Sequence, residues 1–205
     1  MGGAGDLQTI LHRNPAIAEL LDRFEEIALP DAWLVAGCLV QTVWNAAAGN
    51  DPAYGIRDID LIYHDAGDLS AAAEQDHEHR LRAWFAHLPA KLDVKNQARV
   101  HLWYEQRFGR PILPYSSSAA AIATFPATAT SLGVRMAAGR FEVCAPFGVT
   151  DLFSLIVRAN PRLVTRAVYE AKAARWQSLW PALTVIPWDE ATDPAMLSQS
   201  SGGTP

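Results

Sequence analysis

Residues 57–63 read RDIDLIY, and this short run decides the fold because it places two charged side chains in an otherwise apolar strand. Successive side chains of a β-strand alternate between its faces, so Asp58 and Asp60 share one face while Ile59 and Leu61 share the other. The apolar face predicts contact with a core. The two carboxylates lie about 7 Å apart along the chain and repel each other unless water or a cation separates them.

A strand, a glycine and a helix precede this run. Residues 33–36 are apolar, Gly37 follows, and residues 39–44 repeat their apolar side chains with a helical period. A helix that begins after a glycine presents free backbone N–H groups to which a phosphate can come close, and the helix dipole favours the anion. Taken alone, the same pattern also fits an ordinary turn.

A third aspartate, Asp93, lies between Leu92 and Val94 in another expected strand. If this strand lies beside RDIDLIY, the three carboxylates Asp58, Asp60 and Asp93 meet on one face of a sheet. Such a group suits Mg²⁺, and two such ions can hold the attacking and leaving oxygens of a nucleotidyl transfer. The alternative is that the aspartates simply face solvent.

The rest of the chain alternates between helical periods and turn signals. We expect helices over about 14–30, 70–88, 96–108, 150–157 and 160–171, and a mixture of helix and loop over 115–126. A hairpin turning at Ala138-Gly139 would pair Arg135 with Glu142. Together the elements predict an α+β (α/β-like) fold in which helices flank a mixed β-sheet of about five strands.

Composition narrows the functional class. The 205 residues carry 17 basic and 22 acidic side chains, a net charge of −5, so strong nonspecific nucleic-acid binding is not expected. The sequence contains no run of 18 apolar residues, so a membrane-spanning helix is not expected either. Its two cysteines, Cys38 and Cys144, form no disulfide framework, and we expect a cytoplasmic protein.

These motifs resemble the nucleotidyltransferase superfamily with the polymerase-beta-like fold. The resemblance rests on Gly37-Cys38, on Asp58-Ile59-Asp60 and on Asp93. The blocks VKNQARVHLWYEQRFG, APFGVTDLF and YEAKAARWQSLWPALTVIPW are similar to a bacterial branch of nucleotidyltransferase-like proteins. This predicts a nucleotidyltransferase-like core over 14–146, a helical part over 147–188 packed on it, a flexible or partly helical N-terminus over 1–13 and a disordered tail over 189–205.

The resemblance also implies roles. Gly37 and the amide of Cys38 would bind the phosphates of an NTP, and Asp58 and Asp60 would bind two Mg²⁺ ions, for which Mn²⁺ could substitute. Asp93 would bind the catalytic ion and help to deprotonate the hydroxyl of an acceptor that the sequence does not identify. Cys38 replaces the usual Ser or Gly, and the 19 residues between Cys38 and Asp58 are more than usual, so we expect 49–56 to form a loop over the site.

Other polar residues have competing interpretations. Arg99 is a candidate phosphate ligand through its fork of donors, and Asn96 and His101 are further candidates, although a helix cap and surface positions explain all three equally well. Lys172 and Arg175 could reach a triphosphate, but a solvated helix face explains them better. His77 and His79 do not share a helix face, which argues against a metal site there.

Two alternative functions remain open. Asp93-Val94-Lys95 fits the acidic-x-Lys element of a metal-dependent nuclease, but this leaves Asp58 and Gly37 without a role. The other alternative is a protein that keeps the fold and acts by binding a partner rather than by catalysis.

Overall fold

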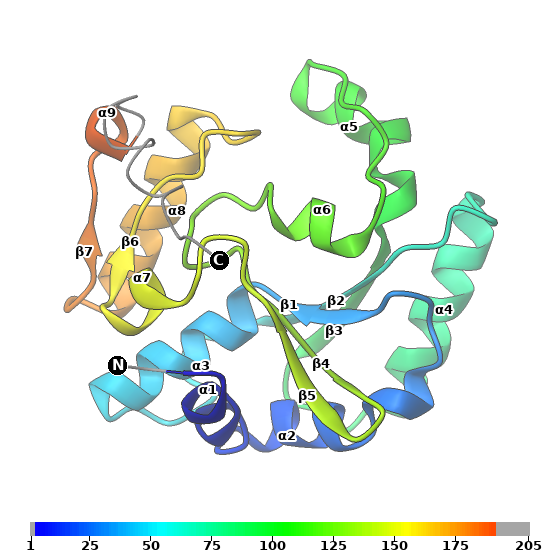
Figure 1. Ribbon diagram of the computed structural model, residues 1–205, viewed down its shortest axis with the longest axis horizontal. Coiled ribbons are helices and arrows are strands. Elements are labelled where there is room, and N and C mark those ends of the chain that lie inside the picture. The colour runs from blue at the N-terminus through cyan, green and yellow to red at the C-terminus, as the bar shows by residue number, and fades with distance from the viewer. Residues whose placement is uncertain (1–2, 192–205) are drawn as a thin grey trace, which may run out of the picture.

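The computed structural model describes residues 3–191, and a five-stranded mixed sheet forms its centre (Figure 1). The strand order is β3-β2-β1-β4-β5. Within this sheet β2 and β3 run parallel and the other neighbours antiparallel. The strands are β1 (Trp33–Val35), β2 (Asp58–Tyr63), β3 (Lys91–Asn96), β4 (Gly133–Ala137) and β5 (Arg140–Cys144). The expected α+β fold with a five-stranded mixed sheet is therefore confirmed.

Helices cover the sheet from both sides, with α2 and α3 on one side and α5 and α6 on the other (Figure 1). The longer helices are α1 (Ala4–Leu11), α2 (Pro15–Asp22), α3 (Gly37–Ala48), α4 (Ala71–Trp84), α5 (Val100–Phe108) and α8 (Arg166–Leu179). The shorter ones are α6 (Ser118–Ile122), α7 (Thr150–Phe153), α9 (Trp188–Ala191) and the 3₁₀ helices η1 (Phe24–Ile27) and η2 (Gln97–Arg99). A second, two-stranded parallel sheet joins β6 (Ile156–Val157) and β7 (Thr184–Val185).

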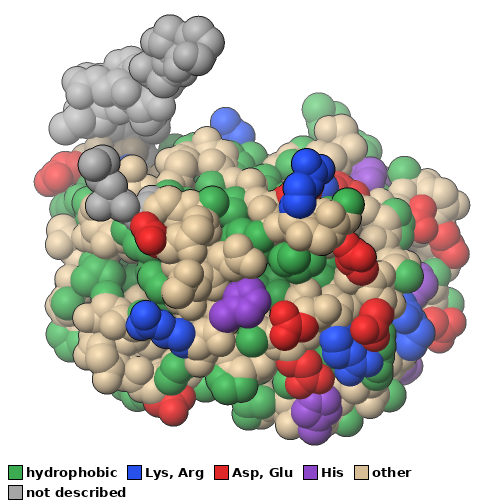
Figure 2. All heavy atoms as spheres, turned by 60° about the horizontal axis from the view of Figure 1, so that its bottom comes forward, with side chains coloured by type: hydrophobic (Ala, Val, Ile, Leu, Met, Phe, Trp, Pro, Cys, Tyr) green, Lys and Arg blue, Asp and Glu red, His purple; other side chains and the backbone are tan. Residues whose placement is uncertain are grey.

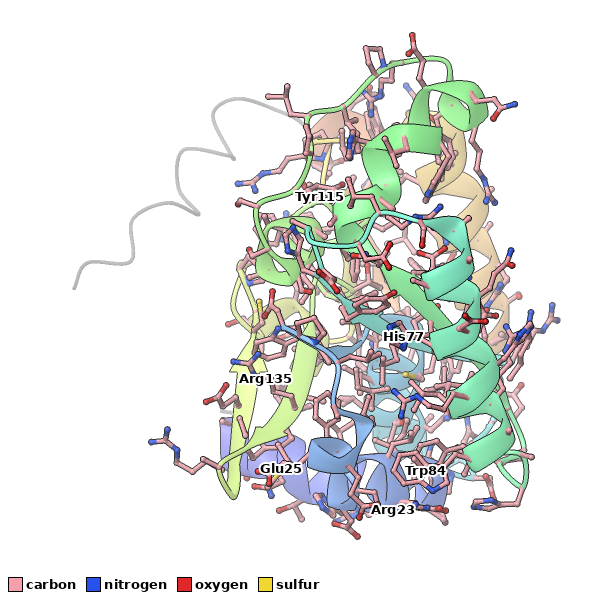
Figure 3. All side chains as sticks on the ribbon, turned by 90° about the vertical axis from the view of Figure 1, so that its right-hand side faces the viewer. Arg23, Glu25, His77, Trp84, Tyr115 and Arg135 are labelled. Atoms are coloured by element: carbon pink, nitrogen blue, oxygen red, sulfur yellow. The ribbon has the colours of Figure 1, made fainter. Side chains whose placement is uncertain are left out.

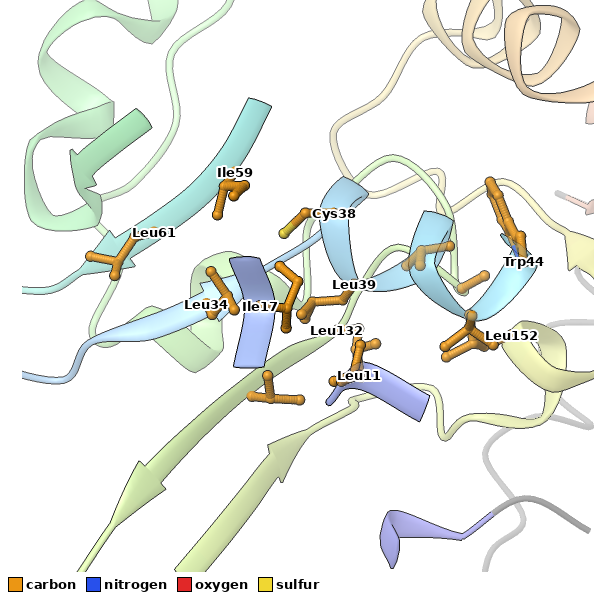
Figure 4. Close-up of a cluster of buried hydrophobic side chains, with 14 of the residues drawn as sticks. Leu11, Ile17, Leu34, Cys38, Leu39, Trp44, Ile59, Leu61, Leu132 and Leu152 are labelled. Atoms are coloured by element: carbon orange, nitrogen blue, oxygen red, sulfur yellow. The ribbon is translucent and has the colours of Figure 1, made fainter. Parts of the chain in front are cut away.

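The core fills the space between one face of the sheet and α3. Leu34, Ile59 and Leu61 point from the sheet toward Cys38 and Leu39 of the helix, and all five are at most 1% exposed (Figure 4). Each fully buried aliphatic side chain contributes about 1.5–3 kcal/mol to stability. The apolar face expected for RDIDLIY is thus the face that fixes β2 in the core.

The opposite face of the sheet is covered only in part by a helix. Trp33 and Ile62 pack with Ile122 of α6 in a second apolar cluster. Gly133 allows this contact, because a Cβ atom there would lie 2.7 Å from Cδ1 of Ile122. Since α6 packs over Ile62, the neighbouring aspartate on the same face, Asp60, is left beside a cavity rather than beneath a helix.

Several local expectations are confirmed. The side chain of Asn14 accepts a hydrogen bond from the Ala16 amide at the start of α2, and Ser70 accepts one from Ala73 at the start of α4. The hairpin pairs Arg135 with Glu142 in the expected register. Their side chains form an ion pair of 2.8 Å.

Several expected helices have different bounds. The helix expected over 14–30 is divided, since α2 ends at Asp22 and the 3₁₀ helix η1 follows it. The helix expected over 150–157 ends at Phe153, because Leu155 adopts a φ of +57° and the next two residues pair with β7. The helix expected from 160 begins at Arg166, where the Thr165 side chain accepts from Val168. Asn160 does not start a helix because its side chain amide donates to two carbonyls in the loop that follows α6.

Both ends of the described chain are helical. The N-terminal segment forms α1, and α9 occupies the beginning of the expected tail, so Asp189 is helical rather than disordered. The remainder of that tail, 192–205, lies outside the described residues. None of the helices in 3–191 combines the length and apolar character needed to cross a membrane.

Contacts at the surface tie the layers together. The Arg23 guanidinium at the end of α2 lies 4.1 Å from the Trp84 ring at the end of α4 (Figure 3). His77 of α4 lies edge-on to the ring of Tyr63, with ring centres 5.6 Å apart. On the face shown in Figure 2, acidic and basic side chains are interleaved rather than separated.

Candidate active site

The site is built on the parallel pair β2 and β3. Asp60 lies opposite Asp93 in the register, and on its other side Asp60 lies opposite Val35 of β1. Residues in register on neighbouring strands point to the same face. Two of the three expected carboxylates are therefore direct neighbours, and Asp58 lies two positions away on the same face, exposed and opposite Lys91.

Two cations lie beside Asp93. Lys95 Nζ is 3.2 Å from Asp93 Oδ1, and Arg82 Nη2 is 3.5 Å from the same oxygen. Both cations also contact Glu78, a buried residue of α4, with Lys95 Nζ 2.7 Å from its Oε2. Asp93 and Glu78 thus share the two positive charges of Lys95 and Arg82. These ion pairs hold the Asp93 carboxylate in place.

The carboxylates do not form a ready-made ion cage. Within the part of the chain that the structure describes, no three His, Cys, Asp or Glu side chains lie close enough together to hold a metal ion. Their chemistry nevertheless suits Mg²⁺, which prefers carboxylate oxygens and keeps several waters. Asp58, Asp60 and Asp93 also share one face of two adjacent strands, so their carboxyl groups project to the same side of the sheet.

The electrostatics at Asp60 favour a cation. Burial, followed by the neighbouring charges of Asp58 and Asp93, raises the pKa of Asp60 to about 7, while Lys172 and Lys95 act in the opposite direction. A carboxyl group that is hard to ionise because carboxylates surround it gains from any added positive charge. The residues therefore fit a divalent cation in charge and in donor type.

The glycine turn lies beside Asp60. Ala36 adopts a φ of +57°, and its carbonyl accepts hydrogen bonds from the amides of Leu39 and Val40 in the first turn of α3. The two amides before them, those of Gly37 and Cys38, stand at the open start of the helix, where backbone N–H groups attract an anion. Ala36 is strained, since non-glycine residues rarely adopt a positive φ.

The side chain of Cys38 points away from this turn. It is fully buried, and its thiol donates to the Val35 carbonyl at 3.4 Å. Burial, with Asp60 nearby, raises the pKa of the thiol far above its usual value. Cys38 therefore offers its amide but neither a hydroxyl-like donor nor a nucleophilic thiolate to the site.

A cavity of about 700 Å³ opens above Asp60. Its floor includes Ala36, which follows β1, and Asp60 of β2, and its walls include α5 and the loop and first turns of α8. In Figure 1, α5 and α8 stand apart from each other above the sheet. Lys95 and Lys172 also line it. The volume is in the range of small-molecule and cofactor sites.

The other candidate residues lie apart from Asp60. The Arg99 guanidinium contacts Glu74 Oε1 at 2.6 Å and donates through Nε to the Leu69 carbonyl at 2.9 Å. These contacts fix Arg99 against α4, and it is not part of the cavity lining. Asn96 lines the cavity but is buried, and its side chain caps η2 and bonds Asp65.

The expectation of a loop over the site is wrong. The loop at 49–56 packs at the opposite end of α3, where the Asn45 side chain donates to the carbonyls of Pro52 and Tyr54. A separate cavity of about 290 Å³ lies there and shares no lining residue with the one above Asp60. The extra residues therefore anchor the end of the helix against Trp180, whose indole donates to Asn45.

Lys172, for which the sequence favours a solvated helix face, lines the cavity, whereas Arg175 does not. Two further lining residues could not be identified from sequence. Trp103 and Tyr104 of α5 also line the cavity, although nothing in their sequence pattern distinguishes them from residues of an ordinary amphipathic helix.

Comparisons with known proteins agree with this architecture. A family model described as nucleotidyltransferase matches residues 22–185. A protein whose NMR structure is described as revealing a CCA-adding enzyme head domain superposes with a TM-score of 0.73 at 25% identity, over 89% of this chain and 95% of that one. A search of curated proteins gives no match.

Proposed function

Because this chain belongs to the nucleotidyltransferase family, we propose that it transfers an NMP unit from an NTP to the hydroxyl of an acceptor, with Mg²⁺ as cofactor. The observation that carries the proposal is the direct pairing of Asp60 with Asp93 beside the start of α3. Asp60 and Ala36, the residue before α3, line one cavity, so a cation on the carboxylates and phosphates at the α3 amides would lie near each other, as a nucleotidyl transfer requires.

Each residue has a role in this reaction. The amides of Gly37 and Cys38 bind the phosphates that leave, and Lys172, which lines the cavity above Asp60, adds a positive charge. Asp58, Asp60 and Asp93 would hold two Mg²⁺ ions, with Mn²⁺ as a substitute. When bound, these ions neutralise the charge that develops on the phosphoryl oxygens.

The proposed chemical step forms one bond to phosphorus and breaks another. The acceptor hydroxyl oxygen forms a bond to the α-phosphorus, the bond from that phosphorus to the bridging oxygen breaks, and pyrophosphate leaves. Asp93 takes the hydroxyl proton or orients the hydroxyl for its loss. Arg99 has no assigned contact in this scheme, because Glu74 and Leu69 already occupy its donors.

The test is a binding and turnover comparison of two aspartate variants. Asp60→Asn should lose Mg²⁺-dependent binding of NTPs in calorimetry and all transfer of label from α-³²P-NTPs to candidate acceptors. Asp76→Asn, on the exposed surface of α4, should behave as the wild type. Wild-type protein that binds none of the four NTPs with Mg²⁺ would favour the non-catalytic alternative, and full activity in Asp60→Asn would refute the metal site.

A further inference from the structure

The half of the cavity that lies along α5 has a different chemistry from the carboxylate half. Trp103, Tyr104 and Phe108 line it, and the rings of Tyr104 and Phe108 lie 4.6 Å apart. Arg107 and Arg110 line the same region, and the Arg107 guanidinium is 5.6 Å from the Phe108 ring. This wall therefore combines aromatic faces with fixed positive charges.

Two exposed apolar side chains, Phe108 and Val168, line this cavity, and two more lie on α5 and the loop after it. Leu102 and Phe108 of α5 are 56% and 49% exposed, Leu113 in the following loop is 86% exposed, and Val168 across the cavity is 39% exposed. Four of the six large exposed hydrophobic residues in the described chain thus lie on α5, on the loop after it or on α8. Exposed apolar groups concentrated at one site indicate a binding surface.

The charge of the lining is opposite to that of the whole protein. Lys95, Arg107, Arg110 and Lys172 face two carboxylates, Asp60 and Glu74, and Glu74 is already paired with Arg99. The protein as a whole carries a net charge of −5. A positive cavity in a negative protein selects an anionic ligand.

The place of α5 assigns this wall to the acceptor. In a phosphoryl or nucleotidyl transfer the attacking and leaving oxygens lie roughly in line on opposite sides of the phosphorus. The leaving phosphates belong at the start of α3, which follows β1, on one side of Asp60. The opposite side of Asp60 is β3, which continues through η2 into α5.

We propose that the α5 wall is the acceptor subsite and that it binds a nucleotide, either free or at the end of a single strand. Aromatic faces stack on any base, and the arginines pair with phosphate. The assignment of this wall to the acceptor rests on the proposed function, because the acceptor hydroxyl must face Asp93. The binding of a nucleotide to α5 itself requires neither an NTP nor Mg²⁺.

The strand-end form of the ligand is tested with a labelled five-residue single-stranded RNA in EDTA, measured by fluorescence anisotropy at constant ionic strength. Phe108→Ala and Arg107→Ala should each weaken binding at least about five-fold, the lower end of what one stacked base contributes. The matched controls are Tyr54→Ala, an exposed ring at the other cavity, and Arg140→Ala in the hairpin, and neither should change the affinity.

The free-nucleotide form is tested by competition and by direct titration with AMP. Displacement of the RNA by AMP at equal affinity, or binding of AMP alone, would identify a mononucleotide as the ligand, whereas binding of RNA that AMP does not displace would identify a strand end. If neither probe binds the wild type, or if both α5 variants bind like the controls, the proposal is overturned.

A separate titration with MgATP distinguishes failure of this proposal from failure of the proposed function. Phe108→Ala and Arg107→Ala should retain the Mg²⁺-dependent component of ATP binding that the wild type shows, and a matching loss of that component would assign the wall to the donor and refute the acceptor subsite. Wild-type protein that binds RNA or AMP but not MgATP would refute nucleotidyl transfer while supporting the nucleotide site on α5.

Discussion

Asp60 and Asp93 are direct neighbours across the parallel strands β2 and β3, and Asp60 lines the cavity beside Ala36, the residue before α3. The arrangement places like charges together where burial already disfavours ionisation. The folded protein therefore carries an electrostatic cost at this point, which a bound cation would remove.

The first prediction concerns stability against pH. The pKa of Asp60 is raised to about 7, so the folded protein retains a proton that the unfolded chain releases above pH 4, and the stability contributed by this group falls as the pH rises toward 7. Asp60→Asn should therefore raise the free energy of unfolding in EDTA by about 2 kcal/mol at pH 8, about half of the full effect because the carboxyl is partly solvated.

This gain should be smaller at pH 5, where much of the cost is absent. Urea denaturation at the two pH values measures it, with Asp76→Asn as the control. An equal gain at pH 5 and pH 8 would contradict the raised pKa. The same variant is expected to lose transfer activity, so that stability and function oppose each other at Asp60.

The second prediction concerns Lys95. Its ammonium group contacts Asp93 and Glu78 and places a positive charge beside the proposed ion site. Lys95→Met should free the Asp93 carboxylate and remove a repulsive charge, so the affinity for Mn²⁺ should rise by about three- to ten-fold. Lys95→Arg keeps the charge and should leave the affinity unchanged. Electron paramagnetic resonance of free Mn²⁺ gives both values, and weaker binding by Lys95→Met would show that the ammonium assists the site.

The features that could be predicted from sequence are those that depend on local patterns. The alternation of apolar and charged residues in RDIDLIY fixed which face of β2 enters the core, and the pairing of Arg135 with Glu142 followed from the position of the turn. The face shared by Asp60 and Asp93 followed once their strands were assumed to be neighbours.

The features that could not be predicted depend on tertiary packing. No sequence signal shows that α5 and α8 enclose the cavity above Asp60, because both helices have weak amphipathic patterns and meet only through the fold. The positive φ of Leu155, which ends α7 early, could not be predicted from the sequence either, since leucine has no preference for that conformation. The position of the loop at 49–56 depends on its contacts to Asn45, which the length of the segment does not indicate.

The third prediction separates backbone strain from phosphate binding at two glycines. Gly37→Ala should leave the free energy of unfolding within about 1 kcal/mol, because the added Cβ would lie 3.0 Å from the flexible end of Gln41, which can move. The methyl group narrows the approach to the first amides of α3, and MgATP should bind several-fold more weakly. Calorimetry measures this loss.

Gly49→Ala, at the other end of α3, should show the opposite result. Gly49 has a φ of +69°, so alanine there costs about 1–2 kcal/mol of stability. Its distance from the phosphate site means that MgATP affinity should not change. If Gly37→Ala binds MgATP normally, the start of α3 is not the phosphate site.

The fourth prediction tests the packing of the 49–56 loop. Asn45 is fully buried, its Oδ1 accepts from the Trp180 indole at 2.7 Å, and its Nδ2 donates to the carbonyls of Pro52 and Tyr54. Asn45→Ala leaves the buried indole N–H and the Tyr54 carbonyl without these partners, while Pro52 still accepts from Asn14, and the loss should cost about 2–4 kcal/mol. Urea denaturation measures the cost, and the exposed Asn50→Ala is the control.

The same variant also tests where the loop lies relative to the active site. Because the cavity beside Trp180 shares no residue with the cavity above Asp60, Asn45→Ala should bind MgATP with wild-type affinity at temperatures where it remains folded. A loop that closed over the site would instead lose both properties together. Reduced MgATP affinity in a fully folded Asn45→Ala protein would therefore contradict the placement of this loop, and unchanged affinity would separate the anchor of α3 from its phosphate-binding end.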